Sequence, residues 1–379
     1  MSRRSMVSNP DGGESYRPSL PRRARRVGYV VALVAATALA QGTVGTVRVV
    51  GTFAGGAGGA SPSRSGFVIG SPMSARRISR IQMLSATVGV GVAPIVTFSG
   101  RLLRGYLVRT DNGGATWRVT GVFPAGVYPW TTAFVTPGVG YAIDSTGALF
   151  TADAGRTWAT VATTGSPLSI SVRGHVAWIF VERCRHGDGA ANGQCATELD
   201  AYDVGARRAT SVASVPGDQP FASQVGPSSG YVAIGGVTGG RLFTTTDDGR
   251  IWRYIASPCS HGEVSGAIAV SPSHLFLYCG VGSTTLYASS DGGATWRPRP
   301  SPPGGGFDAV GGSTGAYLWQ FDTTLWESHD AGRAWVMVTG VKYGPSGAIA
   351  TYGAHDAWHA VPGHGIYRTT NGVTWTLLR

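Results

Sequence analysis

One short pattern recurs along this chain, and it constrains the fold more than any other feature of the sequence. It appears as TDNGGATW at 110–117, TADAGRTW at 151–158, TTDDGRIW at 245–252, SSDGGATW at 289–296, SHDAGRAW at 328–335 and, one residue shorter, TTNGVTW at 369–375. The tryptophans that end these octets are 41, 94, 44, 39 and 40 residues apart. A period of about 40 residues predicts a stacked array of small supersecondary units, such as a propeller.

The interval of 94 residues spans two periods. Halfway through it lies the segment AYDVGARR at 201–208, which keeps the aspartate and glycine of the octet but has no tryptophan. With this degenerate copy, seven repeats fill residues 76–379.

Each repeat contains short apolar segments separated by Gly, Pro and Ser turns, as in residues 131–150, 265–287 and 308–326. Three such segments lead into the octet, and a fourth follows its tryptophan. The chain holds 58 glycines and only 13% charged residues, which argues against a helical bundle. We therefore predict an all-β, seven-bladed propeller with four antiparallel strands in each blade.

The residue types of the octet suit a hairpin between the third and fourth strands. Asp accepts hydrogen bonds from nearby backbone amides, Gly allows left-handed backbone, and Trp fills the space between adjacent blades. One aspartate in each of several separate repeats cannot converge on a single substrate. The predicted structural residues are Asn112, Trp117, Asp153, Trp158, Asp203, Asp247, Trp252, Asp291, Trp296, Asp330, Trp335 and Trp375.

These octets resemble the Asp-box, or bacterial neuraminidase, repeat. That repeat occurs in sialidases, in sortilin-type receptors, in some cellulose- and xyloglucan-active enzymes and in the photosystem II assembly-factor family. Residues 138–158 resemble the assembly-factor type most, and the repeats are also similar to exported bacterial proteins of this kind. The resemblance implies a propeller, but its members include receptors, scaffolds and hydrolases, so it does not choose a function.

The N-terminal segment predicts export. Residues 1–26 form a basic cytoplasmic leader, and residues 27–47 are uncharged and serve as a signal-peptide core or as a membrane anchor. Cleavage after Ala40 and retention in the membrane both remain open, and both put the rest of the chain outside the cytoplasm. Residues 48–75 are a Gly- and Ser-rich linker to the propeller. We expect a protein that is secreted or anchored to the outer face of the cytoplasmic membrane.

Four cysteines lie beyond this leader, which suggests disulfides in an exported chain. Sequence order pairs Cys184 with Cys195 and Cys259 with Cys279. The residues around the second pair are also similar to a paired-cysteine feature of the exported relatives. A zinc site is the competing interpretation, but there is no C-x-x-C spacing, and we expect no metal.

The sequence offers few groups for catalysis. The R-I-P signature of sialidases is missing, since Arg76 and Arg80 begin only partial copies of it, so no arginine triad can be assigned. We therefore name no catalytic residue. Other glycosidases need two carboxylates across the substrate. Glu263 and Asp308 are the best candidates, because each precedes the innermost strand of adjacent blades.

Arg80, Trp130 and Gln224 occupy comparable places in other repeats, so these five residues could form a ring at the mouth of the central channel. Such a ring could bind a sugar or a peptide, or its members could be ordinary rim residues. No P-loop or dinucleotide motif is present, and we expect no cofactor. Of the net charge of +11, residues 1–40 hold 7 − 2 = +5, and the remaining 24 − 18 = +6 is scattered, which argues against a nucleic-acid partner.

These observations favour an extracytoplasmic, non-catalytic propeller scaffold that binds a protein or glycan partner, acting as a monomer. The alternative is a sialidase-type glycoside hydrolase. A third hypothesis is an assembly factor for a membrane complex.

Overall fold

The computed structural model describes thirteen stretches of the chain. They are residues 32–37, 44–49, 66–96, 102–184, 195–215, 220–226, 228–234, 240–259, 264–280, 284–301, 308–321, 324–341 and 348–379. Residues 1–26, the expected basic leader, lie outside the described residues.

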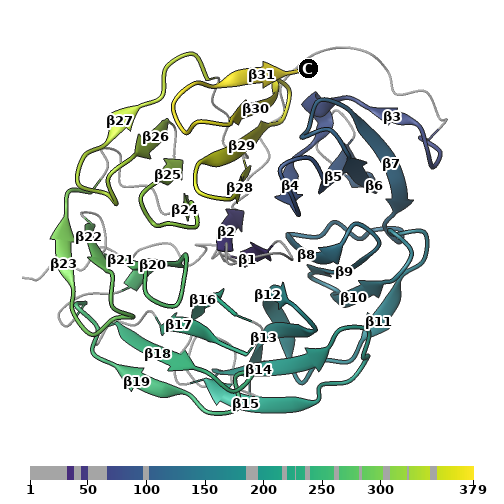
Figure 1. Ribbon diagram of the computed structural model, residues 1–379. Helices are drawn as coiled ribbons and strands as arrows, with labels where there is room; N and C mark the ends of the chain where they lie inside the picture. Colours follow the sequence, from purple (N-terminus) through teal and green to yellow (C-terminus); the bar gives the residue numbers. More distant parts are fainter. Residues whose placement is uncertain are drawn as a thin grey trace, which may run out of the picture. The chain divides into compact units, whose positions relative to one another are not determined.

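Seven small antiparallel sheets follow one another along the chain and form the blades of a propeller (Figure 1). In each sheet four consecutive strands lie side by side in chain order, from the innermost to the outermost. This arrangement confirms the predicted all-β, seven-bladed fold with four antiparallel strands per blade.

The first three blades contain the following strands. Blade 1 has β4 (Arg80–Met83), β5 (Gly89–Val96), β6 (Leu102–Thr110) and β7 (Trp117–Val122); blade 2 has β8 (Thr131–Thr136), β9 (Val139–Asp144), β10 (Gly147–Thr151) and β11 (Ala159–Val161); blade 3 has β12 (Ser166–Arg173), β13 (Val176–Cys184), β14 (Cys195–Asp203) and β15 (Ser211–Val215).

The remaining blades continue the same pattern. Blade 4 has β16 (Pro220–Gln224), β17 (Gly230–Ile234), β18 (Arg241–Thr245) and β19 (Arg253–Ile255); blade 5 has β20 (Val264–Ala269), β21 (Leu275–Cys279), β22 (Thr285–Ser289) and β23 (Arg297–Arg299); blade 6 has β24 (Asp308–Gly311), β25 (Leu318–Phe321), β26 (Leu325–Ser328) and β27 (Val336–Met337); blade 7 has β28 (Ala348–Tyr352), β29 (Asp356–Val361), β30 (Gly365–Thr369) and β31 (Thr376–Leu378).

Two further strands come from the predicted apolar leader. β1 (Ala32–Thr37) and β2 (Val44–Val49) pair antiparallel with each other. Among the described residues, no helix is long and apolar enough to cross a membrane.

The first blade has a fifth strand. β3 (Pro72–Met73), within the segment expected to be a linker, pairs with the outer strand β7, and the short 3-10 helix η1 (Ala75–Arg77) follows it. β3 therefore covers the edge of its own blade and is not exchanged with blade 7.

Side chains and backbone amides join blade 7 to blade 1. Trp358 Nε1 donates a hydrogen bond to the carbonyl of Gly113 (2.8 Å), and the amide of Gly363 donates to the carbonyl of Arg76 (2.7 Å). Arg368 Nη2 of blade 7 donates to the carbonyl of Ala86 in the turn between β4 and β5 (3.2 Å). The ring thus closes through contacts between complete blades.

Apolar side chains from neighbouring blades pack against each other and form the core. Trp358 of blade 7 shares a buried cluster with Trp117 of blade 1, and Trp178 of blade 3 shares one with Phe243 of blade 4. Burial of such aromatic faces supplies about 25 cal/mol per Å² of apolar area removed from water. The junctions between blades therefore hold most of the core.

One predicted disulfide is present, between Cys259 and Cys279. Cys184 and Cys195 are directly opposite each other in the register of β13 and β14. Their side chains lie outside the described residues, so this second bridge stays a prediction.

Candidate functional site

The octets form hairpins that are closed by their own polar side chains. In blade 2, the hydroxyl of Thr151 donates to Asp153 Oδ1 (2.9 Å), and the amide of Thr157 donates to the same oxygen (2.9 Å). The amide of Gly155 donates to the Thr151 hydroxyl (2.9 Å). Hydrogen bonds from Thr157 lower the pKa of Asp153, because they favour the charged carboxylate.

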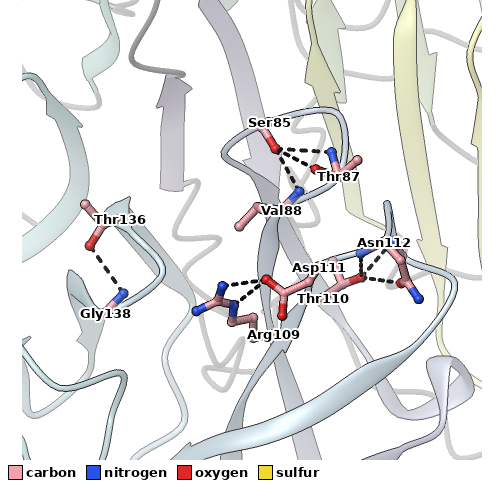
Figure 2. A network of polar contacts seen from close by, with 10 residues as sticks. Ser85, Thr87, Val88, Arg109, Thr110, Asp111, Asn112, Thr136 and Gly138 are labelled. Atoms are coloured by element: carbon pink, nitrogen blue, oxygen red, sulfur yellow. Dashed lines mark hydrogen bonds and ion pairs between the residues drawn. The ribbon is translucent and has the colours of Figure 1, made fainter.

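The first octet keeps this arrangement with an asparagine. Figure 2 shows Thr110 donating to Asn112 Oδ1 (3.0 Å), beside an ion pair between Arg109 and Asp111. The neighbouring turn between β4 and β5 is closed by the hydroxyl of Ser85, which accepts the amide of Val88 (2.8 Å). A carboxylate is thus replaceable here by an amide oxygen, as expected for a structural acceptor.

The fourth residue of the octet has left-handed backbone. The described non-glycine residues with positive φ are Ala154 (60°), Asp248 (62°) and Ala331 (59°), and all three occupy this position. Each backbone amide donates to the turn between the first two strands of its own blade; Ala154, for example, bonds to Gly138 O (2.9 Å). These bonds offset the strain of left-handed backbone.

The octet tryptophans reach the preceding blade. Trp158 Nε1 donates to Val122 O (3.1 Å), Trp296 to Ala256 O (3.1 Å), Trp335 to Pro300 O (2.9 Å) and Trp375 to Glu327 Oε2 (3.2 Å). Trp252 makes an edge contact with Trp178 of blade 3, and Trp117 is buried against blade 7. The remaining octet acceptors, Asp247, Asp291 and Asp330, each accept the hydroxyl of their first residue.

The degenerate hairpin of blade 3 has a substitute for its missing hydroxyl. Ala201 occupies the first position, and the amide of Gly205 donates instead to the hydroxyl of Tyr141 in blade 2 (3.1 Å). The amide after Asp203, that of Val204, still donates to the turn carbonyl of His175 (2.8 Å). A neighbouring blade therefore completes this hairpin.

Two of the five predicted channel-mouth residues lie together. Arg80, the first residue of β4, is 6% exposed, and its Nε donates to the carbonyl of Trp130 (3.0 Å). Its guanidinium also bonds to the hydroxyl of Tyr128 and lies 4.8 Å from the centroid of that ring. Such a cation–π contact stabilises a buried arginine.

Blades 1 and 2, which bring Arg80 and Trp130 together, also contain buried polar groups without hydrogen-bond partners. Trp130 Nε1 and the hydroxyl of Thr131 are buried and have no hydrogen-bond partner within the described residues. The guanidinium of Arg80 has no carboxylate partner in the same part of the chain. Unsatisfied buried donors are costly, which makes this place a candidate binding site.

The other three predicted residues do not join this pair. Gln224 is the last residue of its inner strand, whereas Arg80 is the first of its own, so the two lie at opposite ends of the channel wall. Gln224 Oε1 accepts the hydroxyl of Ser171 from blade 3 (3.1 Å). Asp308 begins β24, but its side chain lies outside the described residues, as does all of Glu263.

The expectation that Gln224 occupies a place comparable to that of Arg80 put the inner strand of blade 4 after Gln224, but β16 begins at Pro220. The Gly and Ser residues that follow Gln224 form the turn into β17 instead.

Sequence reasoning missed a groove between blades 5 and 6. It has a volume of about 570 Å³ and lies along the octets of both blades. Arg297, Arg299 and Arg333 line it, together with His274 and Thr314. A signal was present in the sequence, because Arg299 stands three residues after an octet tryptophan, where four other repeats have an aliphatic residue.

Several buried acids hold other junctions. Asp200 is fully buried and accepts the amide (2.7 Å) and hydroxyl (2.8 Å) of Thr164. Glu327 bonds to Trp375 and lies 3.4 Å from His329 Nε2, and burial raises the pKa of Glu327. Within the described ranges, no three His, Cys, Asp or Glu side chains are grouped so that they could hold a metal ion.

Comparisons with known proteins support the fold. No family model matches the chain, and no curated protein matches it. The solved structure of YCF48 bound to D1 peptide aligns with a TM-score of 0.54 at 15% identity, covering 81% of this chain and 98% of that one. YCF48 from Cyanidioschyzon merolae aligns with a TM-score of 0.52 at 12% identity, covering 79% and 98%.

An enzyme also contains a similar propeller. Puromycin hydrolase, as an S511A mutant complexed with PGG, aligns with a TM-score of 0.58 at 13% identity, covering 81% of this chain and 55% of that one. At such identities the likeness concerns the propeller fold alone.

Proposed function

We propose that this chain is an extracytoplasmic, non-catalytic scaffold that binds a protein partner through the mouth of its propeller beside Arg80 and Trp130. The buried donors at that place carry the proposal: Trp130 Nε1 and Thr131 Oγ1 lack partners within the described residues, and the Arg80 guanidinium bonds there to uncharged oxygens only. Backbone carbonyls and carboxylates of an extended peptide supply such acceptors.

The chemistry of the octets supports the non-catalytic part. Their carboxylates accept two or more hydrogen bonds inside their own hairpins, as Asp153 and Asp330 do. A general acid or nucleophile must instead face the substrate. We infer that the octets are Asp-box repeats, on the hydrogen-bond pattern that six of them share.

The comparison with YCF48 adds a precedent for the class of ligand, since that propeller is described with a bound D1 peptide. Export is supported by the basic leader of residues 1–26 and the uncharged segment 27–47, through which the protein is secreted or tethered to the membrane. A glycan is the second class of ligand that the sequence admits.

The test uses the full chain, immobilised and presented in parallel to a synthetic peptide library and a glycan array. We expect saturable binding of peptides, weakened by Trp130→Ala and unchanged by Tyr254→Ala, which removes an exposed ring from the outer strand of blade 4. Silence in the peptide library overturns the proposal. Release of sugar from fluorogenic glycosides, abolished by Asp308→Asn, overturns the non-catalytic part.

A further inference from the structure

One position differs between blade 5 and four of the other blades. Three residues after the octet tryptophan, blades 2, 4, 6 and 7 have an aliphatic side chain: Val161, Ile255, Val338 and Leu378. In blade 5 the same position is Arg299.

The aliphatic side chain at this position seals the junction with the next blade. Ile255 lies so close to the octet of blade 5 that a Cβ atom at Gly293 would be 3.0 Å from Ile255 Cγ2. Leu378 stands similarly, 3.3 Å from where a Cβ of Gly114 would be. Val338 is only 4% exposed. The position therefore normally removes apolar area from water between two blades.

Arg299 cannot seal the junction in this way, because its charged group must keep polar contacts. Its Nε donates to the carbonyl of Ala331 in the next octet (3.3 Å), and its Nη1 donates to the carbonyl of Pro298 (3.2 Å). The groove of about 570 Å³ lies at this junction. A charged residue thus stands where an apolar contact would otherwise close the surface.

Two more guanidiniums line the same groove. Arg297 comes from β23 and Arg333 from the octet of blade 6, and both are exposed. Burial and the repulsion of Arg333 and Arg297 lower the pKa of Arg299. None of the three arginines forms an ion pair with a carboxylate in the described part of the chain.

The two aspartates that line the groove are held by their hairpins. Asp291 accepts the amide of Thr295 (2.9 Å) and the hydroxyl of Ser289 (2.7 Å), and Asp330 accepts the amide of Ala334 (2.9 Å). Three arginines and two aspartates leave a lining charge of 3 − 2 = +1. Arg299 donates to two backbone carbonyls and Arg333 Nη1 donates to the carbonyl of Asp330 (2.9 Å), which leaves the other guanidinium N–H groups available to an external anion.

We propose that this groove binds a phosphate- or sulfate-bearing small molecule. A tetrahedral oxyanion has three oxygens for the planar N–H forks of several arginines at once, whereas one carboxylate has two. The volume lies in the range of small-ligand sites and is much larger than an inorganic ion. Ser290 and Thr314 line the remainder and offer hydroxyls to a sugar-sized body. This site is separate from the proposed peptide site at the channel mouth.

Calorimetric titration of the full chain, in detergent, tests the proposal with four probes: glucose 6-phosphate, glucose 6-sulfate, inorganic phosphate and glucose. We expect one of the two esters to bind more tightly than inorganic phosphate, and glucose not to bind. Arg299→Ile and Arg333→Gln should each weaken ester binding about tenfold or more, because each removes charge-assisted hydrogen bonds.

The matched control is Arg253→Gln, which removes one positive charge at the blade 4 position that corresponds to Arg297. It should leave affinity unchanged within about twofold, since Arg253 is exposed to screening by salt and does not line the groove. If Arg299→Ile does not fold, Arg333→Gln, at an exposed residue, decides the question.

Three results overturn the proposal. The first is that neither ester binds. The second is that Arg253→Gln weakens binding as much as Arg333→Gln, which means a diffuse charge effect. The third is that hexaglutamate binds to the groove and neither ester competes with it, which assigns the groove to an acidic peptide.

Discussion

The junction between blades 4 and 5 and the junction between blades 5 and 6 have the same hairpins but different fillings. Ile255 packs with Trp296 in an apolar cluster at the first junction, whereas Arg299 stands at the corresponding place in the second. In both, the octet tryptophan donates to a carbonyl of the preceding blade, at 3.1 and 2.9 Å. The tryptophan bond therefore positions a blade, while the residue three places later decides whether the surface closes.

The strongest challenge to this comparison is to place a charge in a sealed junction. Val338→Arg should destabilise the protein by about 3 kcal/mol or more, because its guanidinium would be buried without a partner. Urea unfolding measures the free energy of unfolding. The control is Val336→Arg, two residues earlier in β27, where the side chain is 59% exposed and the change should stay within about 0.5 kcal/mol. Equal losses for both variants would contradict the sealing role.

The imidazole of His359 in blade 7 is fully buried, so it tests how the burial of a titratable side chain affects stability. Burial lowers the pKa of His359 to about 3, below its unfolded value of about 6.5. The unfolded chain therefore binds the extra proton between these values, and stability is complete above pH 6.5 and falls on acidification. Linkage gives a loss of about 2 kcal/mol by pH 5.

Unfolding at several pH values measures this loss. His359→Gln should flatten the profile between pH 7 and pH 5, while His364→Gln, at an exposed residue, should preserve it. A wild-type profile that is level over this range would rule out the buried neutral imidazole.

We expect the octet hairpins to contribute equally to stability at the junction with the groove and at the sealed junctions. Asp330→Ala, beside the groove, and Asp153→Ala, in blade 2, should each cost about 1 kcal/mol through lost hydrogen bonds to backbone amides. Asn at either position should cost less, because Asn112 and Asn371 already serve in two octets. Thermal unfolding of the four variants compares them. A loss at Asp153 alone would show that the groove relaxes its hairpin.

The smallest effect on stability is expected at the groove. Arg299→Ile copies the sealed junction and should change the free energy of unfolding by less than about 1 kcal/mol, with gain favoured, since apolar burial replaces a partly desolvated charge. Chemical denaturation measures it against wild type. A loss above 2 kcal/mol would mean that the carbonyl bonds of Arg299 hold the blades together.

Much of the fold follows from local residues. Spacing of the octets indicated the number of blades, and the order of Gly, Asp and Trp indicated where each hairpin turns. This reasoning could not place Gln224. The predicted start of a short strand can move by several residues along an apolar run while the pattern still fits. The substitute bond of Tyr141 was also beyond it, since the tyrosine and Gly205 are 64 residues apart.

The sequence alone determined the repeat, the blade number and the local closure of the octets, because these depend on residues within eight positions of one another. Tertiary structure decided which side chains meet across a junction: Arg80 with Trp130, Trp358 with Gly113 and Arg299 with the octet of Ala331. Those contacts depend on how one blade packs against the next. The repeat pattern is the same at every junction, so it does not show which two side chains come into contact there.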